Sequence, residues 1–197
     1  VDLAQPVSYF NDDFSSYGGG KGNFTYLSGD SSKVTSHECG GERGRVMRMA
    51  ANGNAALFLH MYADKTDMTK KLDSGVFRIA FDYCPAADNS TFVFRLLNSR
   101  LTSLSDSSQT NETFGVNGET KLGFYENAKG WTMHYPFILQ KANTWYGVVM
   151  YVDFDLRRIV YCINGEYFGT SSMDDGFTSL CGFAVASPGG ADVYLDN

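Results

Sequence analysis

The chain has 197 residues, 43% of them hydrophobic, and carries a net charge of −6 with a sequence pI near 5.0. This length is enough for one hydrophobic core, and β-sandwiches of this size are often single domains. The acidic balance and the lack of any Lys/Arg cluster exclude nucleic acid as the expected partner. The longest apolar runs, such as 55–59 and 148–152, are far too short to cross a bilayer, so we expect no membrane insertion.

Short runs that alternate apolar and polar residues predict strands along the first half of the chain. These runs cover 7–14, 24–27, 34–37, 45–49, 56–61, 77–84 and 92–97. Residues 15–32 are rich in Gly and Ser, and the polar segment 64–72 is expected to contain a short helical turn. The segment 98–112 is rich in Ser and Thr without apolar periodicity, which is typical of a long and often functional loop.

The second half continues with further short strands, predicted at 114–116, 121–125, 131–137, 145–152, 158–163, 166–168, 177–186 and 192–195. Asn164-Gly165 is a strong hairpin signal, because a type I′ turn needs positive φ at both central residues. Both faces of strands 145–152 and 158–163 are fairly apolar, so we expect both sides of their sheet to be covered. There is no internal repeat and no convincing helix, and the predicted fold class is all-β.

Several short motifs point to one superfamily. They are a Trp145-Tyr146-x-Val148 strand leading to Asp153, an Asn164-Gly165-Glu166 turn, an Asp12-Asp13-Phe14-Ser15 opening strand, a Gly75-x-x-x-Ile79-x-Phe81-Asp82 strand and a closing strand that ends in Asp196-Asn197. Together they resemble the concanavalin A-like, laminin-G-like jelly-roll superfamily over nearly the whole chain. The resemblance implies a two-sheet antiparallel jelly-roll β-sandwich, and we take 1–197 as one such domain. It also implies a sugar-binding module, a lectin, a glycan hydrolase or lyase, or an adhesive domain, and fold alone does not choose among these.

The sequence lacks the motifs of familiar catalytic sites. There is no G-x-S-x-G elbow, and none of the three histidines has the spacing of a metal site. The glutamates are scattered instead of forming the E-x-D-x-x-E strand of glycan hydrolases on this fold, and no Q-x-H strand of related lyases is present. We therefore predict no catalytic residues. A set assembled from separate strands, for example His134, Tyr135, Arg95 and Glu126, stays open as the enzymatic alternative.

A sugar-binding face has better support in the sequence. Sugar rings have apolar C–H faces that pack on aromatic rings, while their hydroxyls need planar polar partners. The aromatic and histidine side chains near 125–135 lie close together on two adjacent predicted strands, and strand alternation brings polar side chains from strands expected to be neighbours. The predicted ligand residues are Trp131, Tyr125, Tyr135, His134, Arg95 and Asp82, with Lys121 beside them.

Each of these rings can instead belong to the core. Trp131 and Tyr135 share a face with Met133, and such an apolar stripe is equally typical of a buried side. We expect Trp145, which matches the superfamily's strand-opening tryptophan, to be a core residue. Trp131 follows Lys129-Gly130 and is expected to be the more exposed of the two tryptophans.

The resemblance also implies a structural calcium ion that joins the first and last strands. Its predicted ligands are Asp12 and Asp13 in the opening strand and Asp196 in the closing strand. Calcium takes six to eight oxygens, so backbone carbonyls and water would supply most of them. The alternative is that Asp12 and Asp13 only flank a turn and remain solvated.

The four cysteines, Cys39, Cys84, Cys162 and Cys181, allow three pairings and show no C-x-x-C spacing. We expect Cys84, Cys162 and Cys181 to be small buried side chains. A disulfide remains open, and the sequence does not identify it.

These observations favour a non-catalytic carbohydrate-binding module of a larger secreted or cell-surface protein, with polysaccharide and the other domains of that protein as partners. We expect the chain to be an excised module, because it begins at Val1 and ends at Asn197 within a predicted strand. The alternatives are a glycan lyase or glycoside hydrolase on the same fold, and a protein-binding or structural adhesin domain.

Overall fold

The computed structural model describes residues 8–9, 11, 25–28, 33–51, 55–60, 71–98, 112–116, 120–126, 130–132 and 137–196. Their regular structure consists of fourteen β-strands and one 3-10 turn, η2 (Gly41–Arg43), without an α-helix among them. In this part of the chain, no helix has the length and apolar character needed to span a membrane. The predicted all-β class is confirmed.

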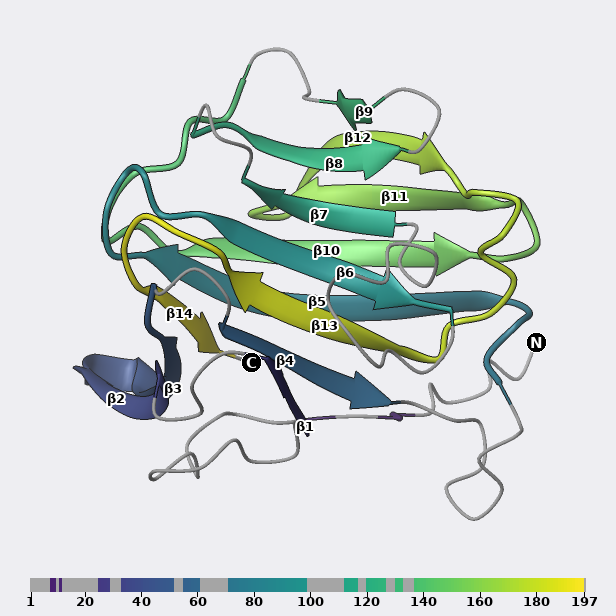
Figure 1. Ribbon diagram of the computed structural model, residues 1–197. Coiled ribbons are helices and arrows are strands. Elements are labelled where there is room, and N and C mark those ends of the chain that lie inside the picture. The colour runs from purple at the N-terminus through teal and green to yellow at the C-terminus, as the bar shows by residue number, and fades with distance from the viewer. Residues whose placement is uncertain are drawn as a thin grey trace.

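The strands form two antiparallel sheets of seven strands each. Sheet 1, in spatial order, consists of β1 (Thr25–Ser28), β4 (Ala55–His60), β13 (Gly182–Ser187), β6 (Phe92–Leu97), β7 (Glu112–Val116), β8 (Leu122–Glu126) and β9 (Gly130–Thr132). Sheet 2 consists of β12 (Glu166–Ser172), β11 (Arg158–Ile163), β10 (Tyr146–Asp153), β5 (Val76–Pro85), β14 (Val193–Asp196), β3 (Gly44–Met49) and β2 (Val34–Gly40). Figure 1 shows one layer behind the other, with most strands of both running along a similar direction. The predicted jelly-roll β-sandwich is confirmed.

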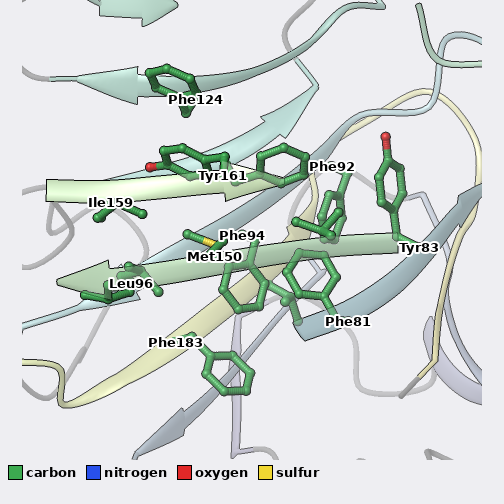
Figure 2. Packing of buried hydrophobic residues seen from close by; sticks show 14 of the residues in the cluster. Phe81, Tyr83, Phe92, Phe94, Leu96, Phe124, Met150, Ile159, Tyr161 and Phe183 are labelled. Carbon is green, nitrogen blue, oxygen red and sulfur yellow. The ribbon is translucent and has the colours of Figure 1, made fainter. Parts of the chain in front are cut away.

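Aromatic stacks between the two layers form the centre of the core. Phe81 of β5 stacks on Phe94 of β6 with ring centroids 4.4 Å apart. Phe124 of β8 stacks on Tyr161 of β11 with centroids 4.5 Å apart and an interplanar angle of 1°. Figure 2 shows these rings between the layers. Because each stack joins one strand of sheet 1 to one strand of sheet 2, the stacks hold the sandwich together and fix which side of each strand faces inward.

The hairpin between β11 and β12 has the predicted turn. Asn164 and Gly165 have φ of 52° and 82°, as a type I′ turn requires. Strands β6 and β11 also have the bounds that the alternating pattern predicts. Local patterns were therefore sufficient where a strand carries clear alternation and a turn signal bounds it.

The predicted strand 177–186 is shorter in the structure, where β13 begins at Gly182. Phe177, Leu180 and Cys181 are buried, but they lie outside named strands, and Leu180 makes only an isolated bridge to Leu72. Burial, not strand pairing, explains the apolar character of this segment.

Other predicted segments are described only in part. Ser8, Tyr9 and Asn11, within the predicted first strand, belong to no strand, and β9 ends at Thr132. The rest of strand 7–14, most of segments 15–32 and 64–72, the interior of segment 98–112 and residues 133–136 lie outside the described residues.

Candidate functional site

Three of the predicted ligand residues occupy one row across sheet 1. Tyr125 of β8 pairs with Trp131 of β9 on one side and with Thr113 of β7 on the other, and Thr113 pairs with Arg95 of β6. Residues directly opposite one another in a sheet share a face. Phe124, next to Tyr125, points into the core, so Tyr125 points away from it. We call Arg95, Tyr125 and Trp131 the sheet 1 row; it lies on the outer side of sheet 1.

The two rings of the sheet 1 row contact each other edge to face. The centroids of Tyr125 and Trp131 are 5.9 Å apart with an interplanar angle of 71°, and both side chains are half-buried. Arg95 is two strands from Tyr125, about 10 Å at standard strand spacing. It is also half-buried, and its removal from water lowers the pKa of its guanidinium. The row therefore combines two aromatic rings with one cation on a partly covered surface.

A second aromatic contact lies near the start of β8. The ammonium of Lys121 is 4.6 Å from the ring centroid of Phe137, a cation–π geometry. Alternation along β8 places Lys121 on the same side as Tyr125. Lys121 therefore directly precedes β8, four residues from Tyr125, and its observed ring contact is with Phe137, outside the sheet 1 row.

The alternative catalytic set is not assembled by its described members. Glu126 is 6% exposed, and it accepts hydrogen bonds from the Ser172 amide at 3.1 Å and the Thr132 hydroxyl at 3.2 Å. By alternation it points to the opposite side of sheet 1 from Arg95. His134 and Tyr135, members of this set and of the predicted ligand set, lie outside the described residues.

Asp82 does not join the sheet 1 row, and the prediction that its strand neighbours the others is wrong. Asp82 lies on β5 of sheet 2, whose neighbours are β10 and β14. There it is directly opposite Asp196 of β14, and both carboxylates face outward because Phe81, Tyr83 and Leu195 beside them are buried in the core. Alternation predicts which side of a strand a residue occupies, but it does not identify the strands that lie beside it.

Arg43 joins the two carboxylates of sheet 2. It lies at the end of η2, in the tip of the β2–β3 hairpin that curls at one edge of the sandwich in Figure 1. Its Nη1 donates to Oδ2 of Asp82 and to Oδ2 of Asp196, each at 2.8 Å. Its guanidinium also lies 4.1 Å above the centroid of the Trp145 ring. The hairpin tip thus folds over the outer side of sheet 2, a contact that no local sequence signal predicts.

Trp145 differs from its predicted role. It was expected in the core, but it is half-buried just before β10 and carries the Arg43 guanidinium on its ring. Trp131 is half-buried as well, so the expected contrast between the two tryptophans is not observed. A strand-opening position does not by itself decide burial, because here the hairpin tip, far away in sequence, supplies a polar cover.

The described residues do not form a calcium site. Asp196 is the one predicted ligand among them, and its carboxylate contacts a guanidinium, whose charge disfavours a second cation. The described residues contain no group of three or more His, Cys, Asp or Glu side chains arranged to hold a metal ion. Asp12 and Asp13 lie outside the described residues, so the calcium prediction remains to be tested by experiment.

All four cysteines are free thiols. Cys84 and Cys181 are buried as predicted, Cys162 is half-buried, and Cys39 is exposed. Burial, with a smaller effect of the neighbouring Cys39, raises the pKa of Cys84 to about 11, and Arg43 opposes this rise. Cys84 is therefore a poor nucleophile in the folded domain.

The outer side of sheet 2 is more exposed than the sequence predicts. Both sides of β10 and β11 were expected to be covered, yet Tyr151 is 38% exposed and Val149 and Val160 are only half-buried. On β12, Tyr167 is 60% exposed. Arg43, Tyr151 and Tyr167 are not among the predicted site residues. For Tyr151, the available signal was its alternation with the core residues Met150 and Val152 of β10.

Comparisons with known proteins identify the fold. No family model and no curated protein sequence matches the chain. Among solved structures, the T. cruzi calreticulin globular domain aligns with a TM-score of 0.60 and 11% identity over 96% of this chain and 88% of that chain. The carbohydrate-binding module CBM66 from Bacillus subtilis aligns with a TM-score of 0.51 and 10% identity, over 89% and 92% of the two chains.

Carbohydrate-active enzymes align with the chain as well. An alginate lyase of polysaccharide lyase family 7 has a TM-score of 0.52 and 14% identity, over 82% of this chain and 78% of that chain. A sialidase aligns with 95% of this chain, which spans only 15% of the sialidase's own length. Identities this low establish similarity of fold alone. The described residues therefore share the jelly-roll β-sandwich fold of these solved structures.

Proposed function

We propose that the domain is a non-catalytic carbohydrate-binding module and that the sheet 1 row binds polysaccharide. The observation that carries this proposal is the alignment of Arg95, Tyr125 and Trp131 in one cross-strand row that points away from the core. Aromatic rings pack against the apolar C–H face of a sugar ring. A guanidinium donates hydrogen bonds to sugar hydroxyl or carboxylate oxygens. The row supplies both kinds of contact within reach of a few sugar units.

The expected affinity follows from the area that the rings can cover. If each ring buries about 50 Å² of sugar at about 25 cal/mol/Å², it contributes about 1 kcal/mol. Two rings with a few hydrogen bonds correspond to a Kd of roughly 10 μM to 1 mM. Such an affinity suits a module that acts by avidity within a larger secreted or cell-surface protein, and we include that location in the proposal.

Two cationic side chains lie on the outer side of sheet 1, within or beside the row. On the outer side of β6 and β8, the described charged residues are Arg95 and Lys121, both cations. Glu126 points to the other side and is held by backbone and hydroxyl donors. Guanidinium and ammonium groups donate hydrogen bonds to carboxylate as well as hydroxyl oxygens, so we include a carboxylated polysaccharide among the proposed ligands; salt would weaken this contact.

Affinity electrophoresis tests the proposal directly. The native domain, Trp131→Ala and Tyr125→Ala are run through gels that contain polygalacturonate, alginate or a neutral glucan. We expect polygalacturonate or alginate to retard the native domain and each variant to bind roughly eightfold more weakly, which corresponds to about 1.2 kcal/mol. Tyr167→Ala, which removes an exposed tyrosine of sheet 2, is the matched control. Equal retardation of all four proteins by the acidic gels contradicts the proposal.

The same gels test the predicted calcium ion and the two alternative functions, an enzyme and an adhesin domain. Loss of retardation in EDTA, with Trp131 intact, supports the calcium ion that the sequence motifs imply. Release of reducing ends or unsaturated products, lost in His134→Ala or Tyr135→Phe, favours a lyase or hydrolase. A domain that neither migrates more slowly nor cleaves any polysaccharide is better explained as a protein-binding or structural adhesin domain.

A further inference from the structure

The outer side of sheet 2 has an exposed surface of its own. Tyr151 on β10 and Tyr167 on β12 are 38% and 60% exposed, and Val76 at the start of β5 is 58% exposed. Five half-buried residues of small or medium size lie between and beside the two tyrosines on this side: Ala80, Gly147, Val149, Val160 and Cys162. Two exposed residues also share it, Arg78 opposite Tyr151 and Thr170 opposite Val160. We call the two tyrosines and these five residues the sheet 2 face.

The two tyrosines are separated by a low strip of side chains. Tyr151 pairs with Val160, and Tyr167 pairs with Cys162, two residues further along β11. The two tyrosines are thus separated by two strand spacings across the sheet and by two residues along the strands. With standard strand spacing and rise per residue, their Cα atoms lie about 12 Å apart. The hydroxyl of Tyr167 shares a hydrogen bond of 3.1 Å with that of Thr170, which restricts its ring. No large side chain of β10 or β11 rises between the rings, so one extended ligand has access to both.

Polar groups lie at one end of this strip. Gly147 pairs with Asp82, and a Cβ built on Gly147 would lie 3.1 Å from Oδ1 of that aspartate. Asp82 therefore leans over a position that carries no side chain. The Arg43 bridge holds its carboxylate in place, and the side-chain oxygen of Asn164 accepts a hydrogen bond from the Gly147 amide at 2.8 Å. These are fixed, planar polar groups beside an aromatic and aliphatic strip, a combination that matches a polymer with apolar ring faces and many hydroxyls.

The charges around the sheet 2 face balance one another. Among the described residues, three arginines and three aspartates lie around it on the outer side of sheet 2: Arg43, Arg78 and Arg158, with Asp82, Asp153 and Asp196. Arg158 pairs with Asp153 at 3.5 Å, and Arg43 bridges the other two carboxylates. A balanced face offers no net attraction to a charged ligand, so a neutral one fits it.

We propose that the sheet 2 face is a second carbohydrate-binding site, which takes an uncharged polysaccharide and is separate from the sheet 1 row. The two surfaces lie on opposite sides of the sandwich, so one domain binds two glycan chains at once and links an acidic polysaccharide to a neutral one. The second site does not depend on the first, because the sheet 2 face keeps its geometry whether or not the sheet 1 row binds.

A neutral polysaccharide is a better occupant of this face than a protein. Stable protein interfaces bury about 800 Å² on each partner around a continuous apolar centre. The sheet 2 face has a narrow strip of small side chains between two separated rings, with hydrogen-bonding groups at its end. Such a strip contacts successive sugar rings one at a time. Self-association of the domain through this face is the competing outcome in the experiment.

The experiment compares Tyr151→Ala, Tyr167→Ala and their combination in gels that contain a neutral glucan, a neutral mannan or polygalacturonate. We expect a neutral polysaccharide to retard the native domain, each single variant to bind it roughly eightfold more weakly and the combination to bind it roughly sixtyfold more weakly. Retardation by polygalacturonate stays unchanged in these variants, whereas Trp131→Ala shows the reverse pattern. Tyr151→Phe, which keeps the ring, retains binding, and thermal unfolding confirms that the variants fold.

Three outcomes overturn this proposal without affecting the proposed function. The first is a native domain that neither neutral polysaccharide retards. The second is retardation by a neutral polysaccharide that persists in the combined variant. The third is a native dimer in light scattering that the combined variant turns into a monomer. A competition experiment decides whether the two sites are separate. Soluble neutral glucan should leave the retardation of the native domain by polygalacturonate unchanged. If the glucan abolishes that retardation, both polysaccharides share one site.

Discussion

Substituting Gly169 by alanine tests how tightly β12 packs against the opposite sheet. Gly169 is paired with Tyr161 of β11, and a Cβ at this position would lie 2.7 Å from Cε1 and 3.1 Å from Cζ of Phe124. Carbon atoms prefer a separation of about 3.5–4.0 Å, so the ring of Phe124 has to move by about 1 Å. That ring is stacked on Tyr161 at 4.5 Å and is bounded at its edge by Phe168. These contacts, and the burial of Phe124, restrict the movement of the ring.

Overpacking of this kind costs about 1–3 kcal/mol. The lower chain entropy of alanine in the unfolded state returns about 0.4–1 kcal/mol, so we expect Gly169→Ala to lower the free energy of unfolding by about 1–2 kcal/mol. For a domain of this length that corresponds to a fall in Tm of roughly 2–8 °C. Gly189→Ala is the matched control, because its Cβ would meet only the Thr91 hydroxyl at an ordinary 3.7 Å.

Urea unfolding followed by circular dichroism measures these differences, and a double-mutant cycle assigns the cause. Phe124→Leu makes room beside Gly169. In a chain that carries Phe124→Leu, Gly169→Ala should therefore leave the free energy of unfolding almost unchanged. The expected coupling energy between the two substitutions is about 1–2 kcal/mol. The reasoning is refuted if Gly169→Ala is as stable as the Gly189→Ala control, or if its cost is the same with leucine at position 124.

Three further predictions concern the turn, the thiols and the hairpin contact. Gly165→Ala should cost about 1 kcal/mol in urea unfolding, because φ is 82° at Gly165, and it should be less stable than Gly189→Ala. At about pH 8, iodoacetamide should label exposed Cys39 well before Cys84, whose pKa of about 11 leaves roughly a thousandth of it as thiolate; equal labelling by mass spectrometry contradicts this assignment. Arg43→Gln should lower the free energy of unfolding by about 1 kcal/mol in low salt and by less in about 1 M salt, because the lost ion pairs are partly exposed; an equal loss at both salt concentrations argues against an ionic contribution.

Local sequence patterns predict most of the strands because the determinants are local. In β6, the residues Phe92, Phe94 and Leu96 alternate with less buried ones, and this period of two is the geometry of a pleated strand. Asn164-Gly165 predicts its turn because few residues accept positive φ. The same reasoning failed at 177–181, where Phe177, Leu180 and Cys181 are buried although none of them belongs to a named strand.

The candidate sites were predictable only where their residues share one sheet region. Tyr125 and Trp131 could be placed together, because only three residues separate their strands in the sequence, and such close strands usually pair. Asp82 could not be placed, because its neighbours on β10 and β14 are more than sixty residues away in sequence. The contacts of Arg43 with Asp82 and Asp196 could not be predicted either, because they depend on a hairpin tip that folds over strands distant from it in sequence.

Taken by itself, the sequence determined the all-β class, the turn at Asn164-Gly165 and the side of each clear strand that faces the core, because these depend on backbone preferences and on a period of two. Only the tertiary structure decided which strands lie beside one another. That order places Arg95 in the row with Tyr125 and Trp131, moves Asp82 to the opposite face and leaves Tyr151 exposed. The physical reason is that strand pairing and burial arise from contacts between segments far apart in sequence, which alternation within one strand does not encode.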